Sequence, residues 1–480
     1  MELDPDKIKN NLSGLGVKQA TNLLREWTLN SSDTSQRVLA LEELGILDDG
    51  TNFKFMEQLF LSDEDDEVRL FAGKILKEKY LNHKKITRLS EFVLQNATDL
   101  EQKLLALEIL ENLDSAKSRK IVRNFLRTYI HVELNHKDFA FPDEILSIDC
   151  QTSLSPLVIE VCRNLIMYDY YTHECNYNIT LKDGIIILMN CEGGNLKNIK
   201  DIKALDKLSK LEHLLLQRNN IEQIKGLNHL KNLKILNLSS NYITKIENLE
   251  SLTNLEELYL SNNQIKEIKN LKNLKRLKTL FLDHNSIEKI ENIDELINLE
   301  SLNLSNNKIS IIDNLEKKIN LKKLNLSFNN IIKISGLDGQ QDLIWLYLND
   351  NKIPQIRALS ELSNLKVLNL TNNSISIIEN LDNLTNLLKL ELSNNKIKKI
   401  QGLNNLKKLQ ELFLDKNNIK NMEGIDELER LIILFLESNE ITEFDQKKIE
   451  NLNNLNFIFL NENPLTPKSW ICYKKWARFP

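Results

Sequence analysis

Apolar and polar positions in the second part of the chain follow one repeated pattern. The pattern, L-x-x-L-x-L-x-x-N-x-I, first occurs at Leu211–Ile221, and its Asn recurs every 22 residues until a last step of 24. The Asn residues of the twelve copies are Asn219, Asn241, Asn263, Asn285, Asn307, Asn329, Asn351, Asn373, Asn395, Asn417, Asn439 and Asn463. Units of this length stack on their neighbours to bury a shared core, so the pattern predicts a solenoid.

Each copy combines two apolar spacings. The Leu-x-Leu alternation at Leu214 and Leu216 predicts a short strand with one buried face. The stretch Ile221–Leu230 has an apolar residue at every third position, which suits 3₁₀ turns or a short helix. The Asn between the two spacings carries an amide that can satisfy backbone groups where the chain turns. We therefore expect each copy to contribute one strand to a parallel sheet.

This pattern resembles the leucine-rich repeat family, specifically its 22-residue class, over residues 211–466. The resemblance implies a horseshoe solenoid with a parallel sheet on its concave side. Within that class, the chain looks most like the regulatory subunit of type-1 protein phosphatase. Amphipathic helices of the apolipoprotein type also repeat every 22 residues, but the recurring Asn and the Leu-x-Leu alternation do not fit a continuous helix.

Both ends of the repeat region differ from the pattern, as terminal caps do. Residues 176–210 predict a hairpin with Asp183-Gly184 at its turn, followed by a degenerate repeat. Residues 467–480 predict a short cap helix that carries the rings Trp470, Tyr473 and Trp476. The same segment has four basic residues, Lys468, Lys474, Lys475 and Arg478. Binding to a membrane surface is therefore a second interpretation of this segment.

Residues 1–175 show apolar residues at helical spacing instead. The segment Leu61–Leu76 contains D-x-x-V-R-x-x-A-x-x-x-L, which resembles the signature of HEAT repeats. Ala40, Ala72 and Ala106 recur at related positions, which favours paired helices over an ordinary helical bundle. The expected fold class is thus α+β, with an N-terminal α-helical, HEAT-like domain followed by the leucine-rich repeat horseshoe.

Candidate chemistry is sparse. The sequence has no P-loop, dinucleotide-binding or nucleophile-elbow motif, so we expect no enzyme and no cofactor. The acidic run Asp63–Glu67 lacks the Gly and Glu positions of an EF-hand loop and suits a helix start. Five potential zinc ligands lie near the domain junction: Cys150, Cys162, His173, Cys175 and Cys191. They lack the spacing of a zinc knuckle, so no metal site is predicted, although binding by this set stays an open alternative.

Charge and composition exclude several classes of protein. The net charge is −5, with 21 Lys/Arg and 30 Asp/Glu in residues 1–180 and 42 against 38 in residues 181–480. Neither part is basic enough to predict nucleic-acid binding. No apolar run approaches the roughly 18 residues of a membrane span, and the N-terminus lacks the features of a secretory signal. We expect a cytoplasmic protein with no integral membrane segment, and the oligomeric state is not predicted.

The function should lie on the strand positions between the buried Leu residues, which face the concave surface. Aromatic residues gather there in three groups, the last of which also includes Phe457 and Phe459 near the C-terminal cap. Exposed rings edged by carboxylates are typical of protein-binding hot spots. The predicted partner-binding residues are Tyr259, Phe281, Asp283, Phe328, Trp345, Tyr347, Asp350, Phe413 and Phe435.

The sequence therefore predicts a non-enzymatic scaffold or adaptor that binds a protein partner on its concave face. Two alternatives stay open. The resemblance to the phosphatase regulator implies a regulatory subunit of a protein phosphatase. The basic and aromatic C-terminal segment suggests recruitment to a membrane surface.

Overall fold

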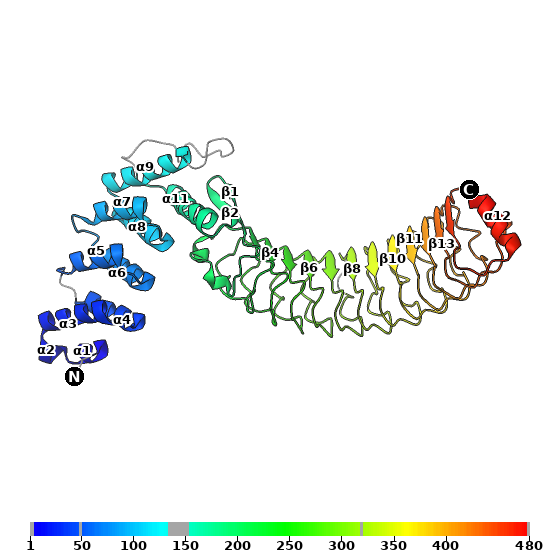
Figure 1. The fold of residues 1–480 in the computed structure, drawn as a ribbon, viewed down its shortest axis with the longest axis horizontal. Coiled ribbons are helices and arrows are strands. Elements are labelled where there is room, and N and C mark those ends of the chain that lie inside the picture. The colour runs from blue at the N-terminus through cyan, green and yellow to red at the C-terminus, as the bar shows by residue number, and fades with distance from the viewer. Residues whose placement is uncertain (1–3, 48–49, 133–152, 317–319, 478–480) are drawn as a thin grey trace. The chain divides into compact units, whose positions relative to one another are not determined.

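The computed structural model describes residues 4–47, 50–132, 153–316 and 320–477. The chain divides into two compact units (Figure 1). We call Met1–Ile187 with Lys203–Leu208 the helical unit, and Leu188–Ile202 with Ser209–Pro480 the solenoid unit.

Paired helices build the helical unit. They are α1 (Pro5–Asn10), α2 (Leu12–Leu15), α3 (Val17–Asn30), α4 (Thr34–Leu47), α5 (Phe53–Ser62), α6 (Asp66–Lys79), α7 (Ile86–Asn96), α8 (Leu100–Leu113), α9 (Ala116–Val132) and α11 (Pro156–Asp169). Helix α3 packs on α4, α5 on α6 and α7 on α8, while α4, α6 and α8 also pack on one another in turn. Ala40, Ala72 and Ala106 lie on these three stacked helices and are fully buried. The predicted helical region is confirmed, and its assignment to HEAT repeats stays a prediction.

The acidic run in this unit has a structural role. Asp65 is the N-cap of α6, and its carboxylate accepts hydrogen bonds from the backbone N–H groups of Glu67 and Val68. Asp63 lies 2.5 Å from the guanidinium of Arg37 on α4. Carboxylates at a helix N-terminus satisfy free N–H groups and complement the helix dipole. The run therefore starts a helix, as the sequence suggests.

A hairpin precedes the repeats. Strands β1 (Asn178–Lys182) and β2 (Ile185–Asn190) are joined at Asp183 and Gly184, whose φ angles are +52° and +78°. Two successive positive φ angles suit the tight turn that matches the twist of a hairpin, and Asp-Gly is a preferred sequence for it.

Each repeat then adds one three-residue strand. The strands are β3 (His213–Leu215), β4 (Ile235–Asn237), β5 (Glu257–Tyr259), β6 (Thr279–Phe281), β7 (Ser301–Asn303), β8 (Lys323–Asn325), β9 (Trp345–Tyr347), β10 (Val367–Asn369), β11 (Lys389–Glu391), β12 (Glu411–Phe413), β13 (Ile433–Phe435) and β14 (Phe457–Phe459). Strands β2 to β14 are neighbours in chain order, and the pairs are parallel. Equivalent positions pair directly, as Leu214 does with Leu236. The predicted parallel-sheet solenoid is confirmed.

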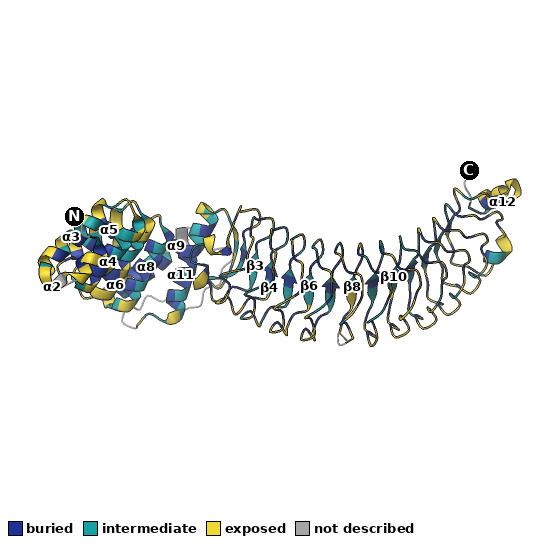
Figure 2. Cartoon of the chain, turned by 90° about the horizontal axis from the view of Figure 1, so that it is seen from below, coloured by how far each residue is buried: buried dark blue, intermediate teal, exposed yellow. Residues whose placement is uncertain are grey.

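The repeat Leu and Ile side chains form one continuous core, and the buried residues are coloured dark blue along the solenoid in Figure 2. In the first complete repeat, Leu214, Leu216, Ile221 and Ile224 are all fully buried. On the outer side most repeats use single turns, such as the hydrogen bond from the Leu230 N–H to the Leu227 carbonyl. These bonds join residues three apart, as the predicted 3₁₀ turns do, and they recur at Leu252, Leu274 and Leu296. Among the described residues, complete 3₁₀ helices lie towards the ends of the repeat region, at Ile199–Asp201, Leu205–Lys207 and Gln446–Ile449.

Helix α12 (Pro467–Ala477) packs on the last repeat. The Tyr473 hydroxyl donates a hydrogen bond of 2.8 Å to the Ile458 carbonyl, and its ring lies 5.5 Å from the ring of Phe444. Tyr473 is only 2% exposed. This helix therefore covers apolar surface that a thirteenth repeat would otherwise cover.

The recurring Asn joins each repeat to the one before it. The Asn241 amide nitrogen donates to the Leu216 carbonyl at 2.9 Å and to the Leu238 carbonyl at 3.0 Å. Its Oδ1 accepts from the Ile221 N–H at 3.0 Å. Equivalent bonds recur along the stack, for example at Asn329 and Asn417. The predicted role of this amide is confirmed, and we call the series the Asn ladder.

A second ladder, seven residues further along each repeat, was not predicted. Asn248 has a φ of +58°, and its side-chain amide donates to the Ile224 carbonyl of the preceding repeat at 2.6 Å. The same bond is made by Asn270, Asn292, Asn314 and Asn380. Gly226, Gly336, Gly402 and Gly424 occupy the equivalent position, also at positive φ. Asn and Gly share the position because both tolerate left-handed backbone.

Candidate functional site

The strand positions that flank the buried Leu residues form the candidate surface. In each of β3 to β14 the middle residue is buried and its two neighbours are partly or fully exposed. The strands line the inner side of the solenoid's curve (Figure 1). Parallel, in-register pairing places equivalent side chains of adjacent repeats side by side.

Tyr259 and Phe281 form the first aromatic contact on this surface. Their ring centroids lie 5.2 Å apart, with the planes at 86°. The Tyr259 hydroxyl donates to Glu257 Oε2 at 2.5 Å. Burial, with a smaller effect of the bond to Glu257, raises the pKa of Tyr259 to about 12. The phenol therefore stays neutral at physiological pH and is held in one orientation.

Asp283 organises the polar groups beside this pair. Its Oδ1 accepts from Ser261 Oγ at 2.6 Å and from Asn303 Nδ2 at 2.9 Å, and its Oδ2 lies 3.1 Å from Nδ1 of His284. The serine and the histidine both contact the carboxylate, and in the described part of the chain no hydrogen bond joins Ser261 to His284. The Asp283 carboxylate therefore links side chains of three adjacent repeats.

Trp345 is the centre of the second predicted group. Lys323 Nζ lies 4.7 Å from the Trp345 ring centroid, and the two residues are register partners in β8 and β9. Tyr347 is half-buried on the same strand as Trp345. Phe328 sits at a φ of +53° and is 50% exposed. Within the described residues no ring contact joins Phe328 to Trp345 or Tyr347, so this group is a set of separate rings.

Asp350 lies at the edge of the second group. Its carboxylate accepts from the side-chain amides of Asn349 and Asn372, each at 2.7 Å. Asn372 belongs to the next repeat, so these bonds fix the carboxylate at the boundary between two repeats.

The third group is a regular stack. The ring centroids of Phe413 and Phe435 lie 4.6 Å apart at an interplanar angle of 12°, and those of Phe435 and Phe459 lie 4.5 Å apart at 10°. Phe457 extends the group, with its ring 6.4 Å from that of Phe459. We call Phe413, Phe435 and Phe459 the ring row. The ring contacts of helix α12 are with Phe444, so the helix does not stack on this row in the described residues.

Lys389 sits at one end of the ring row and was not predicted. Its Nζ lies 4.7 Å from the Phe413 ring centroid, 3.1 Å from Glu391 and 3.4 Å from Glu411. Burial lowers the pKa of Lys389, but the hydrogen bond to Glu391 and the two carboxylate charges outweigh burial and raise it. The sequence could have indicated this contact, because Lys389 is the third residue of the repeat that precedes the repeat of Phe413.

Four of the five potential zinc ligands near the junction lie among the described residues: Cys162, His173, Cys175 and Cys191. No group of three or more His, Cys, Asp or Glu suited to a metal occurs among the described residues. Cys162 and Cys191 are buried, and burial raises the pKa of the Cys162 thiol to about 12. Burial also raises the pKa of the Cys175 thiol. Cys150 lies outside the described residues.

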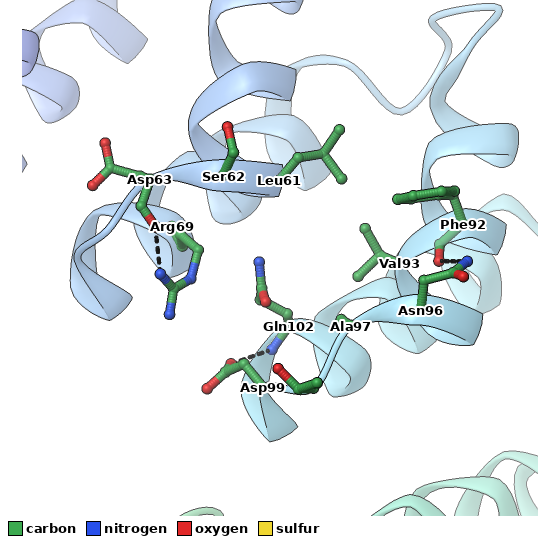
Figure 3. A pocket seen from close by; sticks show the side chains of 11 residues that line it. Leu61, Ser62, Asp63, Arg69, Phe92, Val93, Asn96, Ala97, Asp99 and Gln102 are labelled. Atoms are coloured by element: carbon green, nitrogen blue, oxygen red, sulfur yellow. Dashed lines mark hydrogen bonds between the residues drawn. The ribbon is translucent and has the colours of Figure 1, made fainter.

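A cavity of about 410 Å³ lies in the helical unit, between the ends of α5 and α7 and the starts of α6 and α8 (Figure 3). Several polar side chains that line the cavity already form hydrogen bonds with other lining residues. Arg69 donates to the Asp63 carbonyl, Asn96 to the Phe92 carbonyl, and Asp99 accepts from the Gln102 N–H. We therefore assign no chemistry to this cavity.

Models of the leucine-rich repeat match the solenoid unit. The model described as leucine-rich repeats in two copies matches residues 253–295, 297–339 and 385–427. A second leucine-rich repeat model matches residues 209–265. No curated protein matches this chain.

Solved structures with this architecture are similar to the chain. An internalin, InlF from Listeria monocytogenes, is 26% identical, with a TM-score of 0.56 over 67% of this chain and 87% of that chain. The leucine-rich repeat domain of APL1B is 18% identical, with a TM-score of 0.52 over 68% of this chain and 92% of that chain. The LRIM1/APL1C complex gives 20% identity and a TM-score of 0.53 over 60% of this chain and 55% of that chain.

The fold and these likenesses define a parallel-sheet solenoid preceded by a helical region. The solenoid unit contains leucine-rich repeats, which the family models match over residues 209–295, 297–339 and 385–427. Within the described residues no helix is long and apolar enough to cross a membrane.

Proposed function

We propose that this protein is a non-enzymatic scaffold or adaptor that binds a protein partner on the concave face of its repeats. The observation that supports the proposal is the placement of the rings. Tyr259, Phe281, Trp345 and Tyr347 occupy strand positions that the core does not need, because the Leu residues between them already fill it. Large rings on one partly exposed surface are typical of interface hot spots.

The rings are also held in place before any partner arrives. Tyr259 is fixed by Glu257 and by the ring of Phe281, and Lys323 lies over the face of Trp345. Side chains that are already ordered lose little conformational freedom on binding, so more of the contact energy contributes to affinity.

Membrane recruitment is a second candidate, supported by the outer side of helix α12. Ile471 is 70% exposed and Trp470 is 37% exposed, and Lys474 and Lys475 follow on the same helix. Exposed apolar residues beside lysines suit an anionic membrane surface. Regulation of a type-1 phosphatase remains a proposal that rests on the resemblance of the repeats alone.

The test is affinity capture from lysate with the wild-type protein and a concave variant, analysed by mass spectrometry. The concave variant replaces four rings with Ala: Tyr259, Phe281, Trp345 and Tyr347. A control variant replaces four exposed apolar residues outside the strands with Ala: Tyr242, Ile311, Ile332 and Ile377. Circular dichroism verifies that all three proteins fold.

We expect at least one protein captured by the wild type and the control variant to be lost with the concave variant. Loss of two or three hot-spot rings weakens a typical interface by more than about 4 kcal/mol, which abolishes capture at micromolar concentrations. Identical captured proteins for all three forms would refute the assignment of the concave face.

A further inference from the structure

We propose that the ring row binds a cationic segment of the partner, one that carries arginine or lysine beside apolar residues. This inference rests on the proposed function and specifies the chemistry of the partner at one part of the concave face. Three carboxylates beside the rings, Asp415, Glu437 and Glu462, carry the argument. We call them the acidic row.

The acidic row follows the ring row along the repeats. Asp415 and Glu437 come two residues after Phe413 and Phe435, so they leave their strands on the same face as the rings. Neutral groups of neighbouring repeats hold these carboxylates in place. Asp415 accepts from the Ser393 hydroxyl, and Glu437 accepts from Asn461 Nδ2 at 2.9 Å.

Glu462 is held in the same way in the last repeat, where the Ser438 hydroxyl donates to its Oε2 at 2.5 Å. These donors carry no charge, so they orient the carboxylates without neutralising them. Within the described residues no Lys, Arg or His forms an ion pair with any of the three, and this includes Lys416, the residue after Asp415. Asp415 and Glu437 therefore edge the ring row as uncompensated negative charges, and Glu462 adds a third one position further along the last repeat.

Lys389 shows how this surface accommodates a cation. Its ammonium group lies over the face of Phe413 and between the carboxylates of Glu391 and Glu411. The two carboxylates outweigh burial and raise the pKa of Lys389, so they favour the charged ammonium. The faces of Phe435 are covered by its stacked neighbours, so a partner's cation would reach the carboxylates past the ring edges.

The geometry of the ring row suits long basic side chains. The faces of Phe413, Phe435 and Phe459 are stacked on one another, so mainly their edges form an apolar strip towards the solvent. Lysine and arginine can lay their methylene stems along such a strip while their charged groups reach carboxylates at its edge. Arginine fits best, because its guanidinium binds carboxylates through two parallel hydrogen bonds. The same carboxylates repel nucleic acid and anionic lipid, so the complementary ligand is a protein segment.

The test is the binding of two labelled peptides to the full-length protein, measured by fluorescence anisotropy. One peptide contains four Arg-Leu pairs, and the other contains four Glu-Leu pairs. They match in length and apolar content and differ in the sign of their charge. The protein variants are Phe435→Ala and Glu437→Gln, with Glu443→Gln as a charge-matched control, because Glu443 is exposed outside the strand of the same repeat.

We expect the Arg-Leu peptide to bind and the Glu-Leu peptide not to bind. Phe435→Ala should weaken binding about tenfold, as the loss of a hot-spot ring does. Glu437→Gln should weaken it about threefold and reduce its dependence on salt, since a screened charge pair is lost. Glu443→Gln should bind like the wild type.

Two results would overturn the proposal. One is equal affinity of the Arg-Leu peptide for the wild type and for Phe435→Ala and Glu437→Gln, and the other is tighter binding of the Glu-Leu peptide. Neither result would refute the proposed function, which the capture experiment tests separately. That experiment replaces Tyr259, Phe281, Trp345 and Tyr347 and leaves the ring row intact. If the concave variant lost its partner in the capture experiment and the Arg-Leu peptide did not bind, the scaffold function would be supported. The proposal of a cationic segment would then be rejected.

Discussion

Replacing Asn329 with Ala should lower the free energy of unfolding by about 4 kcal/mol, since each buried backbone group left without a partner costs about 1–3 kcal/mol. The Asn329 amide nitrogen donates to the carbonyls of Leu304, Leu326 and Ser327 at 2.9, 3.1 and 3.1 Å. Its Oδ1 accepts from the Ile309 N–H at 2.9 Å. Alanine makes none of these bonds, and the site is only 7% exposed, so water cannot readily replace them.

Urea unfolding followed by circular dichroism measures this effect, and the next residue provides the control. The Asn330 side chain bonds to Lys352 near the surface. Asn330→Ala should therefore cost no more than about 0.5 kcal/mol, as surface substitutions usually do. A similar loss for both variants would show that the Asn ladder is not what joins the repeats.

Gly424→Ala should destabilise the protein by about 2–4 kcal/mol, from left-handed strain of about 1–2 kcal/mol and a steric clash of similar size. Gly424 has a φ of +91°, and a Cβ built on it would lie 2.1 Å from the Ile400 carbonyl oxygen of the preceding repeat. That oxygen belongs to backbone, so the two repeats would have to move apart.

Gly226 separates the two causes, because it occupies the same position in another repeat. Its φ is +88°, but its Cβ would meet only the flexible side chain of Lys200, at 3.1 Å. Gly226→Ala should thus show the strain without the clash and cost about 1–2 kcal/mol. If thermal unfolding gave equal losses for both variants, close packing between repeats would not be the reason for the glycine.

The fold was largely predictable because each repeat specifies itself locally. Leu alternation fixes which strand residues are buried, and one Asn position fixes where the chain turns, so strands such as β3 and β4 follow from spacing alone. The second ladder was not predicted because the equivalent positions hold chemically different residues, such as Asn248, Gly226 and Ala358. They share a positive φ, which is a property of the backbone and not of hydrophobicity.

The sequence could predict the candidate site only where strand register determines which side chains are neighbours. Register places Phe413 beside Phe435 and Tyr259 beside Phe281. Phe328 itself has a left-handed backbone, which sets the direction of its side chain, so spacing could not show that its ring stands apart. The cation over Phe413 and the bonds that hold the acidic row depend on rotamers of long side chains, which the sequence does not encode in its periodicity.

The most direct measurement of partner binding is photo-crosslinking from two positions in one repeat. Val367 lies partly exposed on strand β10, and Ile377 is 48% exposed in the outer loop of the same repeat. A photoreactive amino acid would replace one or the other in the full-length protein, which would then be irradiated with the captured partner. We predict crosslinks from position 367 and none from position 377. Crosslinks from position 377 without any from position 367 would contradict binding on the concave face.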